Sequence, residues 1–489
     1  MMTLREWLAP WLDIDSNLNA LGVSLNSHEI TEGDVFIALN GAKQHGLAYA
    51  TQAIENGAVA ILFDSQDRHI AEMYFDMSKT VAIAIPDLLQ NLGEMAARFY
   101  QYPSQAMAVI GITGTNGKTS CSQFLSQMLA HCAFIGTLGW GTPSQLNKTL
   151  NTTPDALAVQ KILATLKKTN SQCVAMEVSS HGLAQGRVNG VQFNGAVFTN
   201  LSRDHLDYHG TMEAYLQTKL QLFRTKNLHF AVINLDDAMS ERVIDVIAPD
   251  VTIIGVSALG KKLQRGETVA ARHVQLNLSG IECDIIWQDQ RQTLHIPLIG
   301  RFNLENVLCT LGVMLALGVE FSIAAQKLST LKSVDGRMTR LGGVDNQPLV
   351  IVDYAHTPDA LEKVLKSLRQ HTQGSLSVVF GCGGDRDNGK RPQMGRIAEQ
   401  YADHVFLTDD NPRFESNENI MQAILSGCVM QKHYVIHDRA QAIQTAITQA
   451  SAQDCILIAG KGHEAYQEIE GVQYTFNDTQ CVCDVLAAL

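Results

Sequence analysis

The stretch that decides the fold reads AMAVIGITGTNGKTS and runs from Ala106 to Ser120. It begins with apolar residues typical of a buried strand, breaks into glycines, and ends in Gly117-Lys118-Thr119. Apolar residues then recur between Cys121 and Leu129 at the spacing of one helical face. This order of strand, glycine-rich turn and helix predicts a phosphate-binding loop, because glycines let backbone N–H groups face an anion at a helix N-terminus.

The loop departs from the strict phosphate-loop pattern, which requires a glycine where this chain has Ile112. An ordinary glycine-rich turn between a strand and a helix is the plain structural alternative. The Gly-Lys-Thr ending in this context favours a nucleotide site instead. Lys118 is then expected to reach the β- and γ-phosphates, and the Thr119 hydroxyl to face Mg²⁺.

The length, charge and composition of the chain exclude several classes of protein. The chain has 489 residues, which suggests about three domains. A net charge of −12 argues against a nucleic-acid-binding surface. The longest apolar run, residues 307–319, is shorter than the roughly 18 residues of a membrane span, and no signal peptide is evident. Ten cysteines without a Cys-x-x-Cys pair indicate reduced thiols, so we expect a cytoplasmic protein. From the net charge and the short apolar runs we expect no nucleic-acid or membrane partner.

The expected fold class is α/β with three domains. Residues 1–103 are predicted to form a small α/β domain, with a linker near Gln101–Ser104. Residues 104–332 are predicted to form a parallel-sheet domain that carries the phosphate loop. Residues 333–489 alternate strands with helices, which predicts a second, Rossmann-like α/β domain. Its run Gly381–Gly384 lacks the spacing of a dinucleotide loop.

Polar side chains follow several predicted strands of the central region. Glu177 follows one strand, and His205 lies shortly after the next. Ligands of parallel α/β sheets bind beyond the carboxyl ends of strands, so these residues indicate one shared site. Glu177 and His205 are candidate Mg²⁺ ligands beside Thr119, although Mg²⁺ prefers oxygen and a lone histidine is more often structural.

Two further segments of the central region have both a structural and a functional interpretation. Thr153 is expected to cap a helix with Pro154 as its first residue, and Thr152 and Thr153 also present hydroxyls to an anion. Asn303 and Asn306 share one face of the long apolar helix, where they either bind a nucleotide or only cap the helix.

The motifs taken together resemble the Mur ligases of peptidoglycan synthesis, over nearly the whole chain. The resemblance rests on Gly111–Thr119, Asn151–Pro154, Met176–His181, Asn200–His205, Asp353–His356 and Asp410–Arg413. The last of these is similar to the signature of the branch that adds meso-diaminopimelate, whereas the lysine-adding branch lacks the arginine.

The resemblance implies three substrates: ATP, UDP-N-acetylmuramoyl-L-alanyl-D-glutamate and meso-diaminopimelate. The D-glutamate carboxylate is expected to become an acyl phosphate, which the diaminopimelate amine then attacks. The implied catalytic and metal-binding residues are Lys118, Thr119, Glu177, His205 and Lys219, with Lys219 modified to a carbamate.

The resemblance also implies a binding residue set for each substrate. ATP is expected at Gly114, Thr115, Asn116, Gly117, Lys118, Thr119, Ser120, Asn303, Asn306, Arg337 and Asp353. The muramoyl dipeptide is expected at Leu25, Ser27, the 42–46 loop, Thr152, Thr153, Ser179, Gln185 and Arg187. Diaminopimelate is expected at Arg386, Asp410, Asn411, Pro412, Arg413, Gly460 and Glu464.

We expect the diaminopimelate-adding ligase to be a monomer. Three alternatives to this function stay open at this point. A lysine-adding Mur ligase is disfavoured by Arg413, whose planar fork matches the distal carboxylate that lysine lacks. Cyanophycin and folylpolyglutamate ligases share the ATP loop, but the first domain and the Asp410–Arg413 motif disfavour them. An ATP-binding regulatory module without ligase activity is disfavoured by the complete set of Lys118, Glu177, His205 and Lys219.

Overall fold

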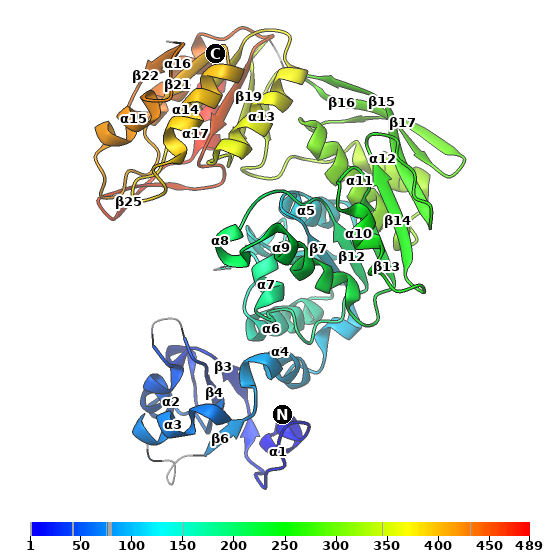
Figure 1. Ribbon diagram of the computed structural model, residues 1–489, viewed down its shortest axis with the longest axis vertical. Helices are drawn as coiled ribbons and strands as arrows, with labels where there is room; N and C mark the ends of the chain where they lie inside the picture. Colours follow the sequence, from blue (N-terminus) through cyan, green and yellow to red (C-terminus); the bar gives the residue numbers. More distant parts are fainter. Residues whose placement is uncertain are drawn as a thin grey trace. The chain divides into compact units, whose positions relative to one another are not determined.

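The structure is a computed structural model that describes residues 2–41, 44–74, 76, 81–149, 151–344, 346–430 and 432–489 (Figure 1). By its internal contacts the chain divides into two compact units. The first comprises Met1–Lys118, Leu129–Ala231 and Glu241–Thr252, and the second comprises Thr119–Met128, Val232–Ser240 and Ile253–Leu489. Among the described residues, no helix is both long and apolar enough to cross a membrane.

The first unit begins with a four-stranded parallel sheet in the order β3-β4-β5-β6. Its elements are β1 (Met2–Thr3), α1 (Leu4–Leu8), β2 (Asn19–Ala20), β3 (Gly22–Ser24), β4 (Asp34–Ala38), α2 (Ala50–Glu55), β5 (Ala60–Asp64), α3 (Arg68–Tyr74), β6 (Ala82–Ile85) and α4 (Leu88–Phe99). Alternate residues of a strand face opposite sides of the sheet. Val35 and Ile37 therefore pack with α1 and α4, whereas Phe36 and Ala38 pack on the opposite face with residues of α2 and α3.

The first unit also contains strands in the order β10-β9-β8-β11-β7-β12. The elements between residues 108 and 244 are β7 (Ala108–Thr113), α5 (Lys118–Met128), β8 (Cys132–Gly136), β9 (Gly139–Thr142), β10 (Gln145–Asn147), α6 (Ala156–Lys168), β11 (Cys173–Glu177), α7 (Ser180–Ala184), β12 (Gly195–Phe198), α8 (Leu206–His209), α9 (Met212–Leu220), β13 (Phe230–Asn234) and α10 (Ser240–Ile244). Of these, α5 after Lys118 and most of β13 belong to the second unit. Strand β7 lies between β11 and β12 and is parallel to both. The phosphate loop therefore leaves the sheet between two neighbouring strand ends.

The second unit contains a long antiparallel ribbon and two helices before its main sheet. These elements are β14 (Thr252–Ser257), β15 (Glu267–Asn277), β16 (Gly280–Trp287), β17 (Gln290–Ile296), α11 (Arg301–Ala316) and α12 (Phe321–Leu328). Strand β15 is parallel to β14 and antiparallel to β16, and β16 pairs with β17. Helix α11 is apolar on nearly all sides and most of its residues are buried.

The main sheet of the second unit has six strands in the order β18-β19-β23-β20-β21-β22. Its elements are β18 (Thr339–Gly342), β19 (Leu349–Asp353), α13 (Pro358–His371), β20 (Leu376–Phe380), α14 (Lys390–Tyr401), β21 (His404–Leu407), α15 (Asn417–Leu425), β22 (His433–Val435), α16 (Arg439–Thr448), β23 (Cys455–Ala459), the hairpin β24 (Tyr466–Ile469) with β25 (Val472–Thr475), and α17 (Asp478–Ala487). Leu349 and Ile351 pack with α13, α14 and α15, whereas Val350 and Val352 pack with α16 and α17. Helices thus cover both faces, as in a doubly wound sheet (Figure 1).

The predicted cap of α6 is wrong. The cap is Asp155, whose side chain accepts a hydrogen bond from the Ala158 N–H, and the helix begins at Ala156. Thr153 does not cap the helix because its hydroxyl lies 2.8 Å from the Glu177 carbonyl oxygen and 3.0 Å from Ser179 Oγ. Its side chain links the loop to the end of β11.

Candidate active site

The predicted strand, loop and helix are present: β7 ends at Thr113 and α5 begins at Lys118. Gly117 has a φ of 85°, a conformation that favours glycine. Gly114 is required for a second reason, because a side chain there would collide with the hydroxyl of Thr199. The glycines therefore allow the loop to approach its neighbour closely, as phosphate loops require.

The loop is held by residues that follow the neighbouring strand β12. The Asn116 N–H donates to Asn200 Oδ1 at 2.9 Å, and the Thr115 N–H donates to the Asn200 carbonyl at 2.9 Å. The Thr199 hydroxyl donates to the Asn116 carbonyl at 2.6 Å. The shape of the loop is thus fixed by side chains on the next strand end, which sequence spacing alone did not indicate.

Two lysine ammonium groups share the carbonyl oxygen of Gly114. Lys118 Nζ lies 2.8 Å from it and Lys219 Nζ lies 2.9 Å from it. Lys219 is only 1% exposed, and its Nζ lies 4.6 Å from the centre of the Tyr215 ring. Burial, assisted by the charge of Lys118, holds the pKa of Lys219 well below its ordinary value, although Asp204 opposes the shift. A lysine in this state has a larger neutral fraction near pH 7, and the neutral amine is the nucleophilic form.

Glu177 is a buried carboxylate at the end of β11, with 1% of its surface exposed. Its Oε1 accepts a hydrogen bond from the Thr137 N–H at 3.0 Å, and its Oε2 accepts one from the Thr137 hydroxyl at 3.1 Å. The same hydroxyl lies 3.0 Å from Thr152 Oγ1. Thr137 therefore orients Glu177 and connects it to one of the residues predicted for the muramoyl dipeptide.

The other central residues predicted for the muramoyl dipeptide lie together. Arg187 Nη1 donates to the Thr153 carbonyl at 2.7 Å, and its Nε donates to Gln185 Oε1 at 2.9 Å. The Ser179 N–H donates to Thr153 Oγ1 at 3.0 Å. Residues from three separate loops thus form one polar network beside the buried carboxylate of Glu177.

His205 has a positive φ of 53° and a half-exposed side chain. Its ring lies 4.9 Å from that of His181, at nearly a right angle, and its Nε2 lies 3.5 Å from Asp204 Oδ2. Among the described residues, His205 and Glu177 belong to no group of three histidine, cysteine or acidic side chains with ligand atoms within 4.8 Å of one another. The predicted pairing of His205 with Glu177 around one ion therefore stays a prediction.

The residues predicted for the uridine end are described only in part. The Ser27 hydroxyl donates to Gln52 Oε1 at 2.7 Å, and Ser27 is 4% exposed. Leu25 is partly buried against the apolar core that α1 and α4 form with the four-stranded sheet. Within the 42–46 loop, Ala42 and Lys43 lie outside the described residues.

Asn303 and Asn306, predicted as nucleotide contacts, are buried and bonded within the second unit. Asn303 Nδ2 donates to the Ile299 carbonyl at 2.8 Å, and Asn306 Nδ2 donates to Asn303 Oδ1 at 3.3 Å. The Cys121 thiol lies 3.7 Å from Asn306 Oδ1. The capping interpretation is wrong, because the N-cap of α11 is Gly300, without a side-chain hydrogen bond, and Asn303 instead bonds a carbonyl before the helix. The role of the two asparagines in ATP binding stays a prediction.

Arg337 and Asp353, the last residue of β19, lie close enough in the second unit for their charges to interact. Asp353 accepts hydrogen bonds from the Met338 N–H at 2.8 Å and the Ala355 N–H at 2.9 Å. Burial raises the pKa of Asp353, and the charge of Arg337 opposes that shift. The Arg337 guanidinium lies 5.1 Å from the centre of the Tyr354 ring. The arginine and the aspartate are thus electrostatically coupled within the second unit.

Most residues predicted for diaminopimelate gather beyond the carboxyl ends of β21 and β23. Asn411 Nδ2 donates to Glu464 Oε2 at 2.9 Å, and Asn411 Oδ1 accepts from Lys461 Nζ at 2.8 Å. Gly460 has a φ of 114°, and a side chain there would come within 2.7 Å of Asp410 Oδ2. Lys461, which is fully buried, was not among the predicted site residues, although the Gly-Lys-Gly-His-Glu run was a usable signal.

Arg413 follows Pro412 in the same cluster and has a φ of 54°. Its Nη1 donates to the Gly384 carbonyl at 2.8 Å, and its Nε lies 3.3 Å from Glu468 Oε2. Arg386 is exposed. Burial raises the pKa of Tyr466, and the positive charges of Arg413 and Arg386 oppose that shift. Glu468, on the hairpin strand β24, was not predicted as a site residue.

A buried ion pair within the second unit links two residues that are 39 positions apart in the sequence. Arg439 Nε and Nη2 donate to the two carboxylate oxygens of Asp478, each at 2.8 Å, and both side chains are fully buried. Arg439 Nη2 also donates to the Ala459 carbonyl at 3.0 Å, at the end of β23. The pair thus fixes α16 and α17 against the strand that leads into Gly460.

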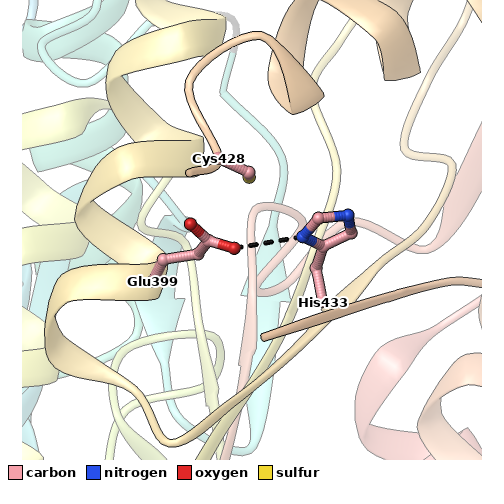
Figure 2. A group of neighbouring side chains, drawn as sticks. All are labelled: Glu399, Cys428 and His433. Carbon is pink, nitrogen blue, oxygen red and sulfur yellow. Dashed lines mark hydrogen bonds and ion pairs between the residues drawn. The ribbon is translucent and has the colours of Figure 1, made fainter. Parts of the chain in front are cut away.

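Glu399, Cys428 and His433 form a tight group at the other end of the second unit (Figure 2). Glu399 Oε2 accepts hydrogen bonds from the N–H groups of Val429 and Met430, at 2.6 and 2.7 Å. Its Oε1 lies 3.0 Å from His433 Nδ1 and also accepts from the Lys432 N–H at 3.2 Å. The carboxylate already has four partners, so we interpret it as an anchor for the loop rather than as a metal ligand.

Replacing Glu399 by alanine is expected to destabilise the protein by about 2–4 kcal/mol, because several loop N–H groups lose their acceptor. Burial raises the pKa of Glu399, but the hydrogen bonds from Met430, His433 and the other loop amides lower it more, so the net pKa is below the ordinary value. Its stabilisation is therefore complete above the unfolded-state pKa and is lost as pH falls through the folded-state pKa. Urea denaturation of both proteins at pH 7 and near pH 4 measures this, with the exposed Glu418→Ala variant as control. Equal unfolding free energies at pH 7 would contradict the anchoring role.

Three family models match consecutive segments of the chain: "Mur ligase family, catalytic domain" at residues 20–100, "Mur ligase middle domain" at 112–314, and "Mur ligase, glutamate ligase domain" at 336–462. With these matches and relatives up to 48% identical over nearly its full length, the chain belongs to the Mur ligase family and is an ATP-dependent ligase. The predicted α/β fold class and family resemblance are confirmed, whereas the domain boundaries at 103/104 and 332/333 stay predictions.

Curated relatives match nearly the full length. The UDP-N-acetylmuramoyl-L-alanyl-D-glutamate–2,6-diaminopimelate ligase of Xylella fastidiosa strain Temecula1 is 48% identical over 473 residues, 96% of this chain and 94% of that protein. The protein of the same name from Coxiella burnetii is 46% identical over 93% of both chains.

Solved structures agree with this relationship. A structure titled as a UDP-N-acetylmuramoyl-L-alanyl-D-glutamate–2,6-diaminopimelate ligase is 36% identical, covers 100% of this chain and 99% of its own, and has a TM-score of 0.73. A MurF ligase from Thermotoga maritima in complex with ADP is 18% identical, with a TM-score of 0.65 over 96% of this chain and 97% of its own. The second similarity concerns the fold alone.

Proposed function

We propose that this chain is an ATP-dependent ligase that joins meso-diaminopimelate to the D-glutamate carboxylate of UDP-N-acetylmuramoyl-L-alanyl-D-glutamate. The observation that carries the proposal is Arg413, which lies in the Asp410–Arg413 motif and is paired with Glu468, in a chain 48% identical to a ligase of that name. In the same motif, Asn411 donates a hydrogen bond to Glu464. The reaction belongs to the synthesis of peptidoglycan precursors.

The chemistry has two steps. The D-glutamate carboxylate attacks the γ-phosphorus of ATP, which releases ADP and forms an acyl phosphate. The diaminopimelate amine then attacks the acyl carbon, loses a proton, and expels inorganic phosphate from a tetrahedral intermediate. Phosphoryl transfer depends on positioning and charge neutralisation, and Lys118 supplies positive charge when it moves from the Gly114 carbonyl to the phosphates.

Residues of the first unit offer donors that suit Mg²⁺. Glu177 provides a buried, oriented carboxylate, and a carbamate on Lys219 would provide a second oxygen ligand. His205 is the predicted third ligand, and the phosphate-loop pattern assigns the Thr119 hydroxyl to the same ion. When bound, the ion would neutralise negative charge on the transferring phosphoryl group.

Carbamylation of Lys219 is supported by its surroundings. The amine is buried, is near a second cation, and has a lowered pKa, so its neutral form is accessible for reaction with carbon dioxide. The neutral amine attacks the carbon of carbon dioxide, which forms an N–C bond and releases one proton. Counted from the protonated amine, the change releases two protons and converts a cation into an anion. A carboxylate-like group at this position would remove the repulsion between Lys219 and Lys118.

Arg413 is proposed to recognise the distal carboxylate of diaminopimelate, which lysine lacks. A planar guanidinium bonds a carboxylate with directed donors, and a substrate without that group leaves the arginine less well paired. Asn411 and Glu464 provide an amide and a carboxylate for the amino-acid end groups. We also propose a monomeric cytoplasmic enzyme with domain boundaries near residues 103 and 332.

Arg413→Ala is expected to raise the KM for diaminopimelate by about a hundredfold, while the KM for ATP changes little. The measurement is phosphate release at saturating muramoyl dipeptide with each substrate varied in turn. Arg396→Ala removes an exposed arginine on α14 and serves as the matched control. An equal rise in both KM values would contradict the assignment of Arg413.

Two other functions make different predictions. A lysine-adding ligase would release phosphate with L-lysine as the amine. A regulatory ATPase would release phosphate without any need for the muramoyl dipeptide and an amino acid together.

A further inference from the structure

The hairpin β24–β25 is joined to the Arg413 loop by its backbone. The Arg413 N–H donates to the Glu468 carbonyl at 3.0 Å, and the Glu470 N–H donates to the Arg413 carbonyl at 2.7 Å. The loop and the hairpin are therefore paired like two short strands, with Arg413 opposite Ile469. Any residue of β24 is consequently held in a fixed relation to the backbone of Arg413.

Glu468 is fixed on a second side by the predicted diaminopimelate residues. Its N–H donates to Asn411 Oδ1 at 3.0 Å, and that oxygen also accepts from Lys461 Nζ at 2.8 Å. Asn411 in turn donates to Glu464. The backbone of Glu468 is thus bonded to both Asn411 and Arg413, so its carboxylate emerges from a well-defined position.

The carboxylate of Glu468 holds one edge of the Arg413 guanidinium. Its Oε2 lies 3.3 Å from Arg413 Nε, while the Gly384 carbonyl accepts from Nη1. Among the residues that the structure describes, Arg413 Nη2 has no hydrogen-bond acceptor. A guanidinium has five N–H donors in a rigid plane, so fixing Nε and Nη1 also fixes the direction of the remaining donors.

We propose that Glu468 is a positioning residue that orients Arg413 toward the distal carboxylate of diaminopimelate and thereby contributes to discrimination against lysine. The proposal rests on the proposed function. Glu468 acts through Arg413 and touches no reacting atom. The alternative role of the same ion pair is competition, in which Glu468 occupies Arg413 and weakens binding of the substrate carboxylate.

The two roles predict opposite changes in one variant. If Glu468 positions Arg413, Glu468→Gln raises the KM for diaminopimelate about tenfold and leaves kcat and the KM for ATP nearly unchanged, because an oriented charge-assisted pair is lost. The preference for diaminopimelate over lysine falls by a similar factor. If Glu468 competes, the KM for diaminopimelate falls. An unchanged or lower KM would overturn the proposal.

Three comparisons separate positioning from a general loss of structure. Glu470→Gln removes the same charge two residues away, where only the backbone contacts Arg413, and it should leave both KM values unchanged. Glu468→Asp keeps the charge and should give an intermediate KM, which supplies a second variant if Glu468→Gln folds poorly. In the Arg413→Ala background, Glu468→Gln should add nothing further, because the two residues act as one unit. Additive effects would overturn the proposal.

The wild-type enzyme distinguishes failure of this inference from failure of the proposed function. Wild type that releases phosphate with diaminopimelate, together with an unaffected Glu468→Gln variant, overturns only the role of Glu468. Wild type that shows no diaminopimelate-dependent release overturns the proposed function and this inference with it.

Discussion

Replacing Lys219 with methionine is expected to lower kcat for diaminopimelate-dependent phosphate release by about a thousandfold, because the anionic group proposed for this position is lost. Methionine retains a long apolar stem beside Tyr215, so the buried site remains filled. Native mass spectrometry in bicarbonate buffer should detect the added mass of one carbon dioxide on the wild-type chain and none on the variant.

The pH and carbon dioxide dependence of wild type follow from the same chemistry. Only the neutral amine reacts, and the pKa of Lys219 is lowered by burial and by Lys118, so modification should increase as pH rises through that lowered value. Removing carbon dioxide should lower wild-type activity, and bicarbonate should restore it. Lys226→Met, at an exposed position, is the matched control. A Lys219→Met enzyme with more than a tenth of wild-type kcat would contradict the carbamate role.

Lys118→Met is expected to lower kcat/KM for ATP by about a thousandfold, since one phosphate-binding cation is removed from the transferring group. In the structure the ammonium group of Lys118 also bonds the Gly114 and Thr115 carbonyls, at 2.8 and 2.9 Å. The variant should therefore be checked for folding by thermal denaturation before its kinetics are compared.

The control for Lys118 is Lys167→Met, at an exposed position in the last turn of α6. Initial rates of phosphate release with varied ATP give kcat and KM for each protein. Near-normal kcat/KM for ATP in a folded Lys118→Met enzyme would remove the phosphate loop from the mechanism.

Local sequence signals predicted much of the fold. The stretch from Ala108 to Met128 combines an apolar run, a glycine-rich turn and a helical face, and each feature indicates the same structure. Strands alternating with helices were also predicted for residues 333–489, because buried parallel strands such as β20 and β23 are continuous apolar runs that end in polar residues. The predicted N-cap of α6 was wrong because the Thr153 hydroxyl bonds the end of β11 instead of the helix, which overrides the local capping preference.

Tertiary partners were the part that sequence spacing did not reveal. Arg439 and Asp478 lie 39 positions apart and meet only because α16 and α17 pack on the same sheet face. Glu468 is on a short exposed hairpin with no distinctive pattern, so its contact with Arg413 required coordinates. Asn303 and Asn306 have the spacing of a binding pair, yet the structure gives both side chains buried internal partners.

The most direct test of the proposed function is phosphate release from ATP in the presence of UDP-N-acetylmuramoyl-L-alanyl-D-glutamate, with meso-diaminopimelate compared with L-lysine. We predict rapid release with diaminopimelate and little with lysine, because only diaminopimelate supplies the carboxylate that Arg413 is proposed to bind. Equal release with lysine would contradict the specificity assigned to Arg413. Release that requires neither the muramoyl dipeptide nor an amino acid would contradict the ligase function itself.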